Sequence, residues 1–264
     1  MRSFERYQAK TSPVHRLAPQ VKLGIVVFFI LSNVLLPDGA WKAFGASWGF
    51  VAGCSLAAGV GAGYLLRRSF IVLPFALAAV TVVFSTPGNT LVHVAALTVT
   101  DAGLVRFSSI LLRSWLSVQM AVLLTATTRF PDLVHALRRF HVPGILTGTA
   151  AFMYRYLGVL GDEAFRLMRA RDARSACAAG DAATGREGGS LRWRAKIAGN
   201  MGGQLFLRSF LRSERVVNAM LSRGYQGTYL PGSVREMQKD DWVRGILAVL
   251  LIGAIQAAAW LFPG

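Results

Sequence analysis

Residues 105–128 read VRFSSILLRSWLSVQMAVLLTATT, an apolar stretch long enough to cross the ~30 Å hydrocarbon core of a bilayer as one helix. Directly after it, Arg129-Phe130-Pro131-Asp132 stops this helix and starts another, with Asp132 placed as a cap. From there to residue 242 the chain is more polar and rich in arginine. This boundary separates a membrane-embedded part from a water-exposed part, and it decides the fold.

The composition also indicates a membrane protein. Of the 264 residues 53% are hydrophobic and 16% are charged, and this charged share is well below the roughly 25% of soluble domains. In a soluble protein the formal net charge of +16 would indicate nucleic acid. In a membrane protein the positions of the positive residues matter more, because they indicate which loops lie in the cytoplasm. We therefore expect an all-α integral membrane protein in contact with membrane lipid and without a nucleic-acid partner.

Four further apolar runs are expected to cross the membrane, at 21–36, about 44–66, 70–84 and 243–261. The second run has small residues at a spacing of four, which lets a helix approach another one closely, within this chain or in a partner. Arg67-Arg68 predict a short cytoplasmic turn. We expect residues 89–104 to form an external segment that is partly a strand or an interfacial helix. Arg113, inside the fourth span, has either a snorkelling or a functional role.

The positions of the basic residues predict the topology. Of the 29 Lys and Arg residues, 24 fall in the segments 1–22, 67–68, 129–141 and 161–242. With five spans all of these segments lie on one side, and positive residues are retained in the cytoplasm. The predicted division is a cytoplasmic basic arm at 1–20, a four-helix transmembrane region at 21–128, a cytoplasmic coupling-helix domain at 129–242 and a final transmembrane helix at 243–264.

The cytoplasmic domain is expected to consist mainly of helices. A short amphipathic helix covers 132–140 and breaks at His141-Val142-Pro143-Gly144. One long helix follows at about 144–178, and we prefer it to a sixth span over 145–160 because Arg155 lies in its middle. A linker at 179–191 leads to a second long helix at 193–222, with Gly224 as its left-handed terminator.

Each long helix ends with arginines. A step of 100° per residue places Arg208, Arg212, Arg215 and Arg223 on one stripe of the second helix. Such a stripe faces solvent or lipid headgroups, or it docks into a groove of a partner, because the arginine fork matches carboxylates and helix-end carbonyls. A second cluster, Arg169 to Arg174, ends the first helix.

Catalytic and metal-binding motifs are missing from the sequence. It has no phosphate-binding Gly-rich loop, no His-Glu-x-x-His and no Gly-x-Ser-x-Gly. The four histidines are scattered, the two cysteines lie far apart, and the predicted spans contain no carboxylate. We therefore expect a protein that is not an enzyme, with no catalytic residue and no metal site.

Several motifs together resemble the transmembrane T component of energy-coupling factor (ECF) transporters, most closely the cobalt and nickel branch, the CbiQ family. They occur in order along the chain: Thr127-Thr128-x-x-Pro131-Asp132-Leu133-x-x-Ala136-Leu137, Val142-Pro143, Tyr154-Arg155-Tyr156, Asp162-Glu163 and Arg169-Ala170-Arg171. The family ends its two coupling helices with Ala-Arg-Gly motifs. These fall on Ser222-Arg223-Gly224 and on Ala170-Arg171-Asp172, with Arg174-Ser175 as a competing placement; Arg174, Arg208, Arg212 and Arg215 are secondary candidates.

The resemblance implies a scaffold in the bacterial inner membrane, multi-pass and with a cytoplasmic N-terminus. It joins two cytoplasmic ATPase subunits to a membrane S component that binds the substrate. The motif arginines insert into grooves of the ATPases, and the closure of the ATPase pair reorients the S component. The implied cargo is Co²⁺ or Ni²⁺, with cobalt serving cobalamin biosynthesis; this chain binds no cofactor, and ATP is used by the partners.

Three alternatives remain open on the sequence. The first keeps the family and changes the cargo to a vitamin. The second is an integral membrane enzyme that acts on lipid-linked substrates, which requires a cluster of polar residues at one depth. The third is a self-contained channel or carrier, which the lack of intramembrane charge disfavours.

Overall fold

The computed structural model describes residues 12–87, 90–94, 97–174, 191–227 and 237–261. It divides into two compact units, which we call the hairpin unit (His141–Pro231) and the membrane unit (Arg2–Phe140 with Gly232–Gly264). The basic arm up to residue 11, the predicted helix end at 175–178 and the linker up to residue 190 lie outside the described residues. These units reflect packing, so the predicted division by membrane location stays a prediction.

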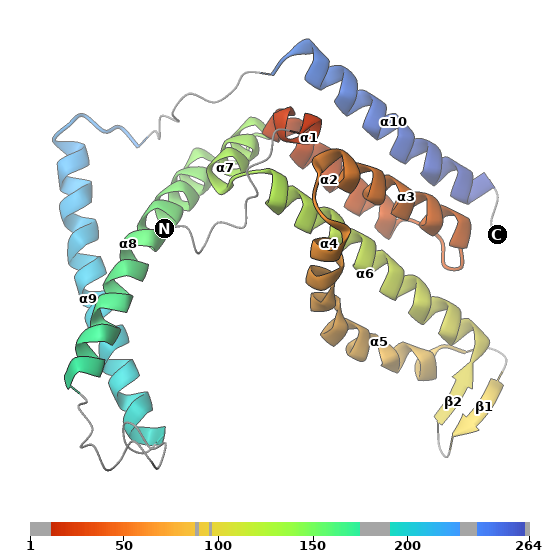
Figure 1. The fold of residues 1–264 in the computed structure, drawn as a ribbon, viewed down its shortest axis with the longest axis horizontal. Coiled ribbons are helices and arrows are strands. Elements are labelled where there is room, and N and C mark those ends of the chain that lie inside the picture. Colours follow the sequence, from red (N-terminus) through yellow and green to blue (C-terminus); the bar gives the residue numbers. More distant parts are fainter. Residues whose placement is uncertain (1–11, 88–89, 95–96, 175–190, 228–236, 262–264) are drawn as a thin grey trace. The chain divides into compact units, whose positions relative to one another are not determined.

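The membrane unit is helical apart from one β-hairpin (Figure 1). Its elements are α1 (Pro13–Arg16), α2 (Pro19–Val34), α3 (Trp41–Ala58), α4 (Ala62–Ser69), η1 (Phe70–Val72), α5 (Leu73–Ser85), β1 (Thr90–Val94), β2 (Leu97–Thr100), α6 (Asp101–Thr127), α7 (Phe130–Arg139) and α10 (Lys239–Leu261). The two strands pair antiparallel. They confirm a strand in the predicted external segment, and Thr100 then caps α6 by accepting a hydrogen bond from the Gly103 amide.

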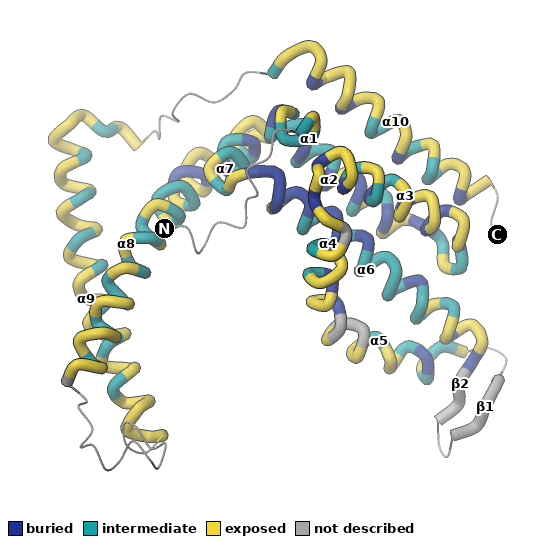
Figure 2. Tube along the Cα trace, viewed as in Figure 1, coloured by how far each residue is buried: buried dark blue, intermediate teal, exposed yellow. Residues whose placement is uncertain are grey.

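The core of the membrane unit lies around α6, which packs against α2, α3, α4 and α5. Leu116 and Met120 of α6 are buried with Phe29 of α2 and Val51 of α3, and Figure 2 shows this buried side of α6 in dark blue. Ile252 of α10 belongs to the same cluster. In lipid such contacts stabilise the bundle by close packing and dispersion, since lipid tails are as apolar as leucine.

The apolar runs of the sequence become helices of different lengths. Among the described residues, α6 and α10 are each long and apolar enough to cross a membrane, and α2 is a shorter apolar helix. The bent pair formed by 63–72 and 77–85 passes the same test as one broken span, with a bend of 58°. The all-α membrane fold expected from the sequence is therefore confirmed.

Two details of the second predicted span are wrong. The run at 44–66 is not one helix: Gly59 adopts the left-handed conformation (φ +65°) and ends α3, so α4 begins separately. Arg67-Arg68 do not form a turn but lie in the last turn of α4, because the chain has no glycine or proline there. The helix α4 ends at Ser69, whose hydroxyl donates to the Leu65 carbonyl at 2.8 Å.

The glycines of α3 are not packed within the described chain. A Cβ atom added at Gly45, Gly49 or Gly53 would meet nothing within 4 Å. The sequence allowed two interpretations of these glycines, packing within this chain or against a partner. The described residues do not show packing within this chain.

Candidate coupling site

The hairpin unit consists of two long helices, α8 (Gly144–Arg174) and α9 (Leu191–Leu221). Their contacts run in opposite directions along the chain, since Thr149 and Met220 line the same groove, whereas Glu163 pairs with Arg208. The helices are therefore antiparallel. Both were predicted from the sequence, and the described part of α8 is one continuous helix through Arg155, as we preferred.

An ion pair joins the two helices. The Arg208 guanidinium donates to the Glu163 carboxylate at 2.6 Å, and Arg166 lies 3.5 Å from the other oxygen of the same carboxylate. The Glu163 side chain is only 13% exposed, while that of Arg208 is 55% exposed. Glu163 is thus the half-buried centre of a small charge cluster that sets the pairing of α8 with α9.

Beside this ion pair lies an apolar groove of about 580 Å³ between the helices. Phe152, Met153 and Tyr156 line it from α8, and Phe210 and Val217 from α9. Phe206, Phe210 and Val217 are more than half exposed, and in Figure 2 most of α9 is yellow. Exposed apolar side chains in such number on one helix indicate a surface that another protein or a membrane covers.

The end of α9 has a well-defined local geometry. The Gly224 amide donates to the Leu221 carbonyl at 3.0 Å, and the Tyr225 amide donates to the Met220 carbonyl at 3.0 Å. These two bonds form a Schellman motif, in which Gly224 takes the left-handed conformation (φ +80°). Met220 and Tyr225 also line the groove together. The predicted terminator is confirmed.

Arg223 is the C-cap residue of this motif and is exposed. The Schellman bonds hold the chain on both sides of it, so its backbone is fixed while its side chain is accessible. Ser222 before it is also exposed, and its hydroxyl donates to the Ala219 carbonyl at 3.1 Å. The helix end therefore presents one guanidinium on a rigid tip.

The first motif lies near the end of α8. Arg171 is half-buried, and its buried Nε finds no hydrogen-bond partner among the described residues. Ala170 and Asp172 on either side are exposed, and Arg174 is the last residue of α8. A buried donor without a partner costs about 1–3 kcal/mol, so a partner carbonyl or carboxylate at this point would stabilise the helix end.

The two motif arginines lie at opposite ends of the hairpin. Each is near the C-terminus of its helix, and the helices are antiparallel. The stretch of α8 from Thr149, beside the end of α9, to Arg171 is about 33 Å long at a rise of 1.5 Å per residue. The hairpin unit can therefore contact two separate partners, one at each tip.

The remaining arginines of the predicted stripe have different surroundings. Arg208 is engaged by Glu163, Arg212 lines the groove, and the Arg215 Nε donates to the Leu211 carbonyl of its own helix at 3.2 Å. Of the four arginines, Arg223 is the one at a helix tip. Sequence reasoning placed the four on one face but did not find the Glu163 pair, whose signal was an acidic residue on the facing helix.

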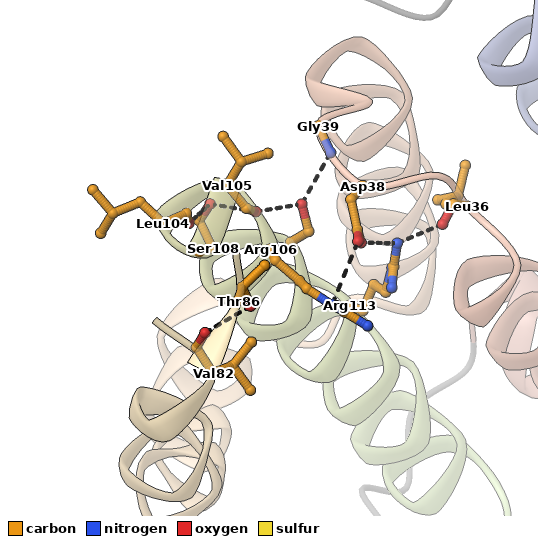
Figure 3. Close-up of polar contacts among 12 residues, drawn as sticks. Leu36, Asp38, Gly39, Val82, Thr86, Leu104, Val105, Arg106, Ser108 and Arg113 are labelled. Carbon is orange, nitrogen blue, oxygen red and sulfur yellow. Dashed lines mark hydrogen bonds and ion pairs between the residues drawn. The ribbon is translucent and has the colours of Figure 1, made fainter. Parts of the chain in front are cut away.

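Arg113, the other arginine raised by the sequence, belongs to the membrane unit (Figure 3). Its guanidinium donates to the Asp38 carboxylate at 2.7 Å and to the Leu36 carbonyl. The Asn33 side chain donates to the Arg113 carbonyl at 3.0 Å, and the Gly39 amide donates to the Ser109 hydroxyl at 3.1 Å. These contacts tie the α2–α3 connection to α6, which is a structural role.

Metal ligation has no candidate in the described part of the chain, where no three His, Cys, Asp or Glu side chains lie together. The fold and the site together define a helical membrane protein that carries an antiparallel helical hairpin with an arginine near each tip.

Comparison with known proteins identifies the family. Residues 10–232 match the CbiQ family, described as cobalt transport protein. The energy-coupling factor transporter transmembrane protein EcfT of Acidaminococcus fermentans is 28% identical over 269 residues, covering 98% of this chain and 97% of the relative. The cobalt transport protein CbiQ of Salmonella typhimurium is 26% identical, covering 84% and 96%. The nickel permease LarQ of Lactiplantibacillus plantarum is 26% identical, covering 44% and 38%.

The chain belongs to the CbiQ family, the T components of ECF transporters. It is a non-catalytic subunit of a transporter, as the sequence predicted.

Proposed function

We propose that this T component couples two cytoplasmic ATPase subunits to a substrate-binding S component through the hairpin unit. The observation that carries the proposal is the placement of Arg171 and Arg223 at opposite ends of one antiparallel pair. An antiparallel helix pair with one guanidinium contact at each end holds one ATPase at each tip, so the movement of the ATPases acts on both ends of the pair. In this proposal Arg171 and Arg223 contact the ATPases, together with the flanking motif residues Ala170, Asp172, Ser222 and Gly224. Secondary candidates for ATPase contact are Arg174, Arg208, Arg212 and Arg215.

The chemistry of both tips supports ATPase docking. A guanidinium presents a planar set of donors that pairs with carboxylates and with helix-end carbonyls. Arg223 is exposed on a fixed backbone, and Arg171 has a buried donor without a partner in the described chain. An acidic groove on an ATPase supplies what each tip lacks. ATP is bound and hydrolysed by those partners, and this chain binds no cofactor itself.

The groove between α8 and α9 supports a second contact, with the S component. Its lining is apolar and its rim side chains are exposed, as expected for a surface that a hydrophobic partner helix covers. A partner seated there moves with the hairpin, which links the ATPase contacts to the substrate-binding subunit.

The cargo we propose is Co²⁺ or Ni²⁺, since relatives named for cobalt and for nickel transport match this chain. Relatives named EcfT match equally well, so a vitamin importer is the second candidate. The orientation we propose has the N-terminus and the hairpin unit in the cytoplasm of a bacterial inner membrane, because 24 of the 29 Lys and Arg residues fall on that side.

The test is the double variant Arg171→Ala/Arg223→Ala, co-expressed with the other subunits. We expect the variant to stay in the membrane, while uptake of radioactive Co²⁺ or Ni²⁺ falls to background and ATP hydrolysis no longer drives transport. The control is Arg155→Ala, an exposed arginine of α8 away from both tips, which should transport normally. Normal metal uptake by the double variant would refute the coupling role. If the wild-type complex takes up a vitamin instead of Co²⁺ or Ni²⁺, the proposed cargo is wrong and the vitamin importer is the correct candidate.

A further inference from the structure

The membrane unit contains a second amphipathic groove, which the coupling function does not use. It has a volume of about 520 Å³ and lies between α2, α7 and α10. The Ser32 hydroxyl donates to Gln256 at 3.0 Å, and Val21 lies against Gly245, so α2 and α10 run parallel, and α10 begins about one turn before the level at which α2 begins. The groove thus has one end at the helix N-termini and extends from there into the apolar helices.

The two ends of the groove differ in chemistry. At the N-terminal end lie Gln20, Arg139 and Trp242, from three different elements. Trp242 is 58% exposed, and tryptophan at the start of an apolar helix is typical of the membrane interface. Towards the bilayer the lining is entirely apolar and includes Ile25, Ile246, Val249 and Leu250.

The polar end has unused hydrogen-bonding capacity. Within the described chain Arg139, at the end of α7, is exposed and has no carboxylate partner. The nearby Asp241 instead accepts from the Gln238 amide at the start of α10. The Gln20 side-chain oxygen is buried and has no hydrogen-bond partner among the described residues. A buried acceptor of this kind requires a donor.

We propose that this groove binds an anionic glycerophospholipid of the leaflet that meets the N-terminus of α10. Its phosphate pairs with Arg139, a headgroup hydroxyl satisfies Gln20, and an acyl chain lies along the apolar wall between α2 and α10. One cation at the interface with a continuous apolar wall below it matches an anionic amphiphile. A soluble anion would leave the wall empty, and a neutral apolar ligand would leave Arg139 and Gln20 unpaired.

Two matched pairs of variants test the proposal. Leu250→Trp fills the groove, while Leu247→Trp adds the same bulk to the same helix outside it; the two leucines are 67% and 68% exposed. Arg139→Gln removes the proposed phosphate contact, and Arg138→Gln removes the neighbouring charge, which does not line the groove. All four positions are exposed, so folding is expected to persist, and gel filtration of each variant checks it.

The measurement is native mass spectrometry of the full chain, delipidated in mild detergent and titrated with dioleoyl-phosphatidylglycerol. We expect one saturable lipid, bound about tenfold more weakly by Arg139→Gln and lost in Leu250→Trp, with both controls like wild type. Phosphatidylcholine with the same chains should bind more weakly, and inorganic phosphate should not displace the lipid. Non-saturable binding that is equal in all variants means annular lipid only, and displacement by inorganic phosphate means an anion site. Either result, or unchanged lipid binding by Leu250→Trp, overturns the proposal.

Discussion

The Glu163 carboxylate and the Arg208 guanidinium lie 2.6 Å apart and join the middle of α8 to the middle of α9. Glu163 also pairs with Arg166 at 3.5 Å, so one carboxylate is shared by two guanidinium groups. We infer that this ion pair helps to set the alignment of α8 with α9, and the positions of both arginine tips depend on that alignment.

We expect Glu163→Gln to loosen the hairpin more than Arg208→Gln, and Arg208→Gln more than Arg166→Gln. The carboxylate is the half-buried member, whereas both arginines are mostly exposed, so the loss on the arginine side should be about 1 kcal/mol or less. Hydrogen exchange of the α8 and α9 amides measures the effect, and the charge-swapped pair Glu163→Arg/Arg208→Glu should recover part of it. Equal exchange in all variants would show that the groove contacts alone align the helices.

The cap of α9 gives a second prediction. Gly224→Ala places a side chain at φ +80°, which costs about 1–2 kcal/mol, so the Schellman motif should open and the Arg223 tip should become disordered. We expect reduced uptake at normal expression, together with faster exchange of the amides around 221–225. Gly202→Ala is the control, because Gly202 is helical and its added Cβ meets nothing within 4 Å. A variant at 224 that transports like the control would mean that the tip needs no fixed backbone.

The ion pair of the membrane unit gives a third prediction. Arg113→Met removes the bonds to Asp38 and Leu36 from a guanidinium whose side chain is 21% exposed, and we expect a loss of about 1–3 kcal/mol. Arg106→Met removes only a 3.9 Å contact to the same carboxylate from a 57% exposed side chain, so little should change. Thermal unfolding in detergent compares the two, and equal melting temperatures would contradict a structural role for Arg113.

The sequence predicted those features that depend on local pattern. Both long helices of the hairpin unit were predicted from runs of sequence between turn signals, and the end of α9 was predicted from Gly224, since few residues other than glycine enter the left-handed conformation without strain. The family motifs also lie within short segments, so they could be recognised without a fold.

What the sequence did not predict depends on contacts between distant segments. The pairing of Glu163 with Arg208 requires knowing that α8 and α9 are antiparallel with this alignment, and no local rule sets that alignment. The break at Gly59 was missed because glycine at a spacing of four in an apolar run is also typical of a packed transmembrane helix. Arg113 was ambiguous for a similar reason: its partner Asp38 lies in the connection after another helix.

Gly103 gives the last prediction, because among the described glycines a Cβ atom added there would lie closest to a neighbouring atom. A Cβ atom added at Gly103 would lie 2.5 Å from the Val83 carbonyl oxygen and 2.7 Å from the Thr100 hydroxyl, so Gly103→Ala must push α5 away from the start of α6. The carbonyl is backbone and cannot rotate aside, and we expect a cost of about 1–3 kcal/mol, the usual range for overpacking. Gly253→Ala in α10 is the matched control, because its Cβ would meet nothing within 4 Å. Thermal unfolding of the two variants in the same detergent should lower the midpoint for Gly103→Ala alone; an unchanged midpoint would mean that α5 moves without cost and does not pack tightly on α6.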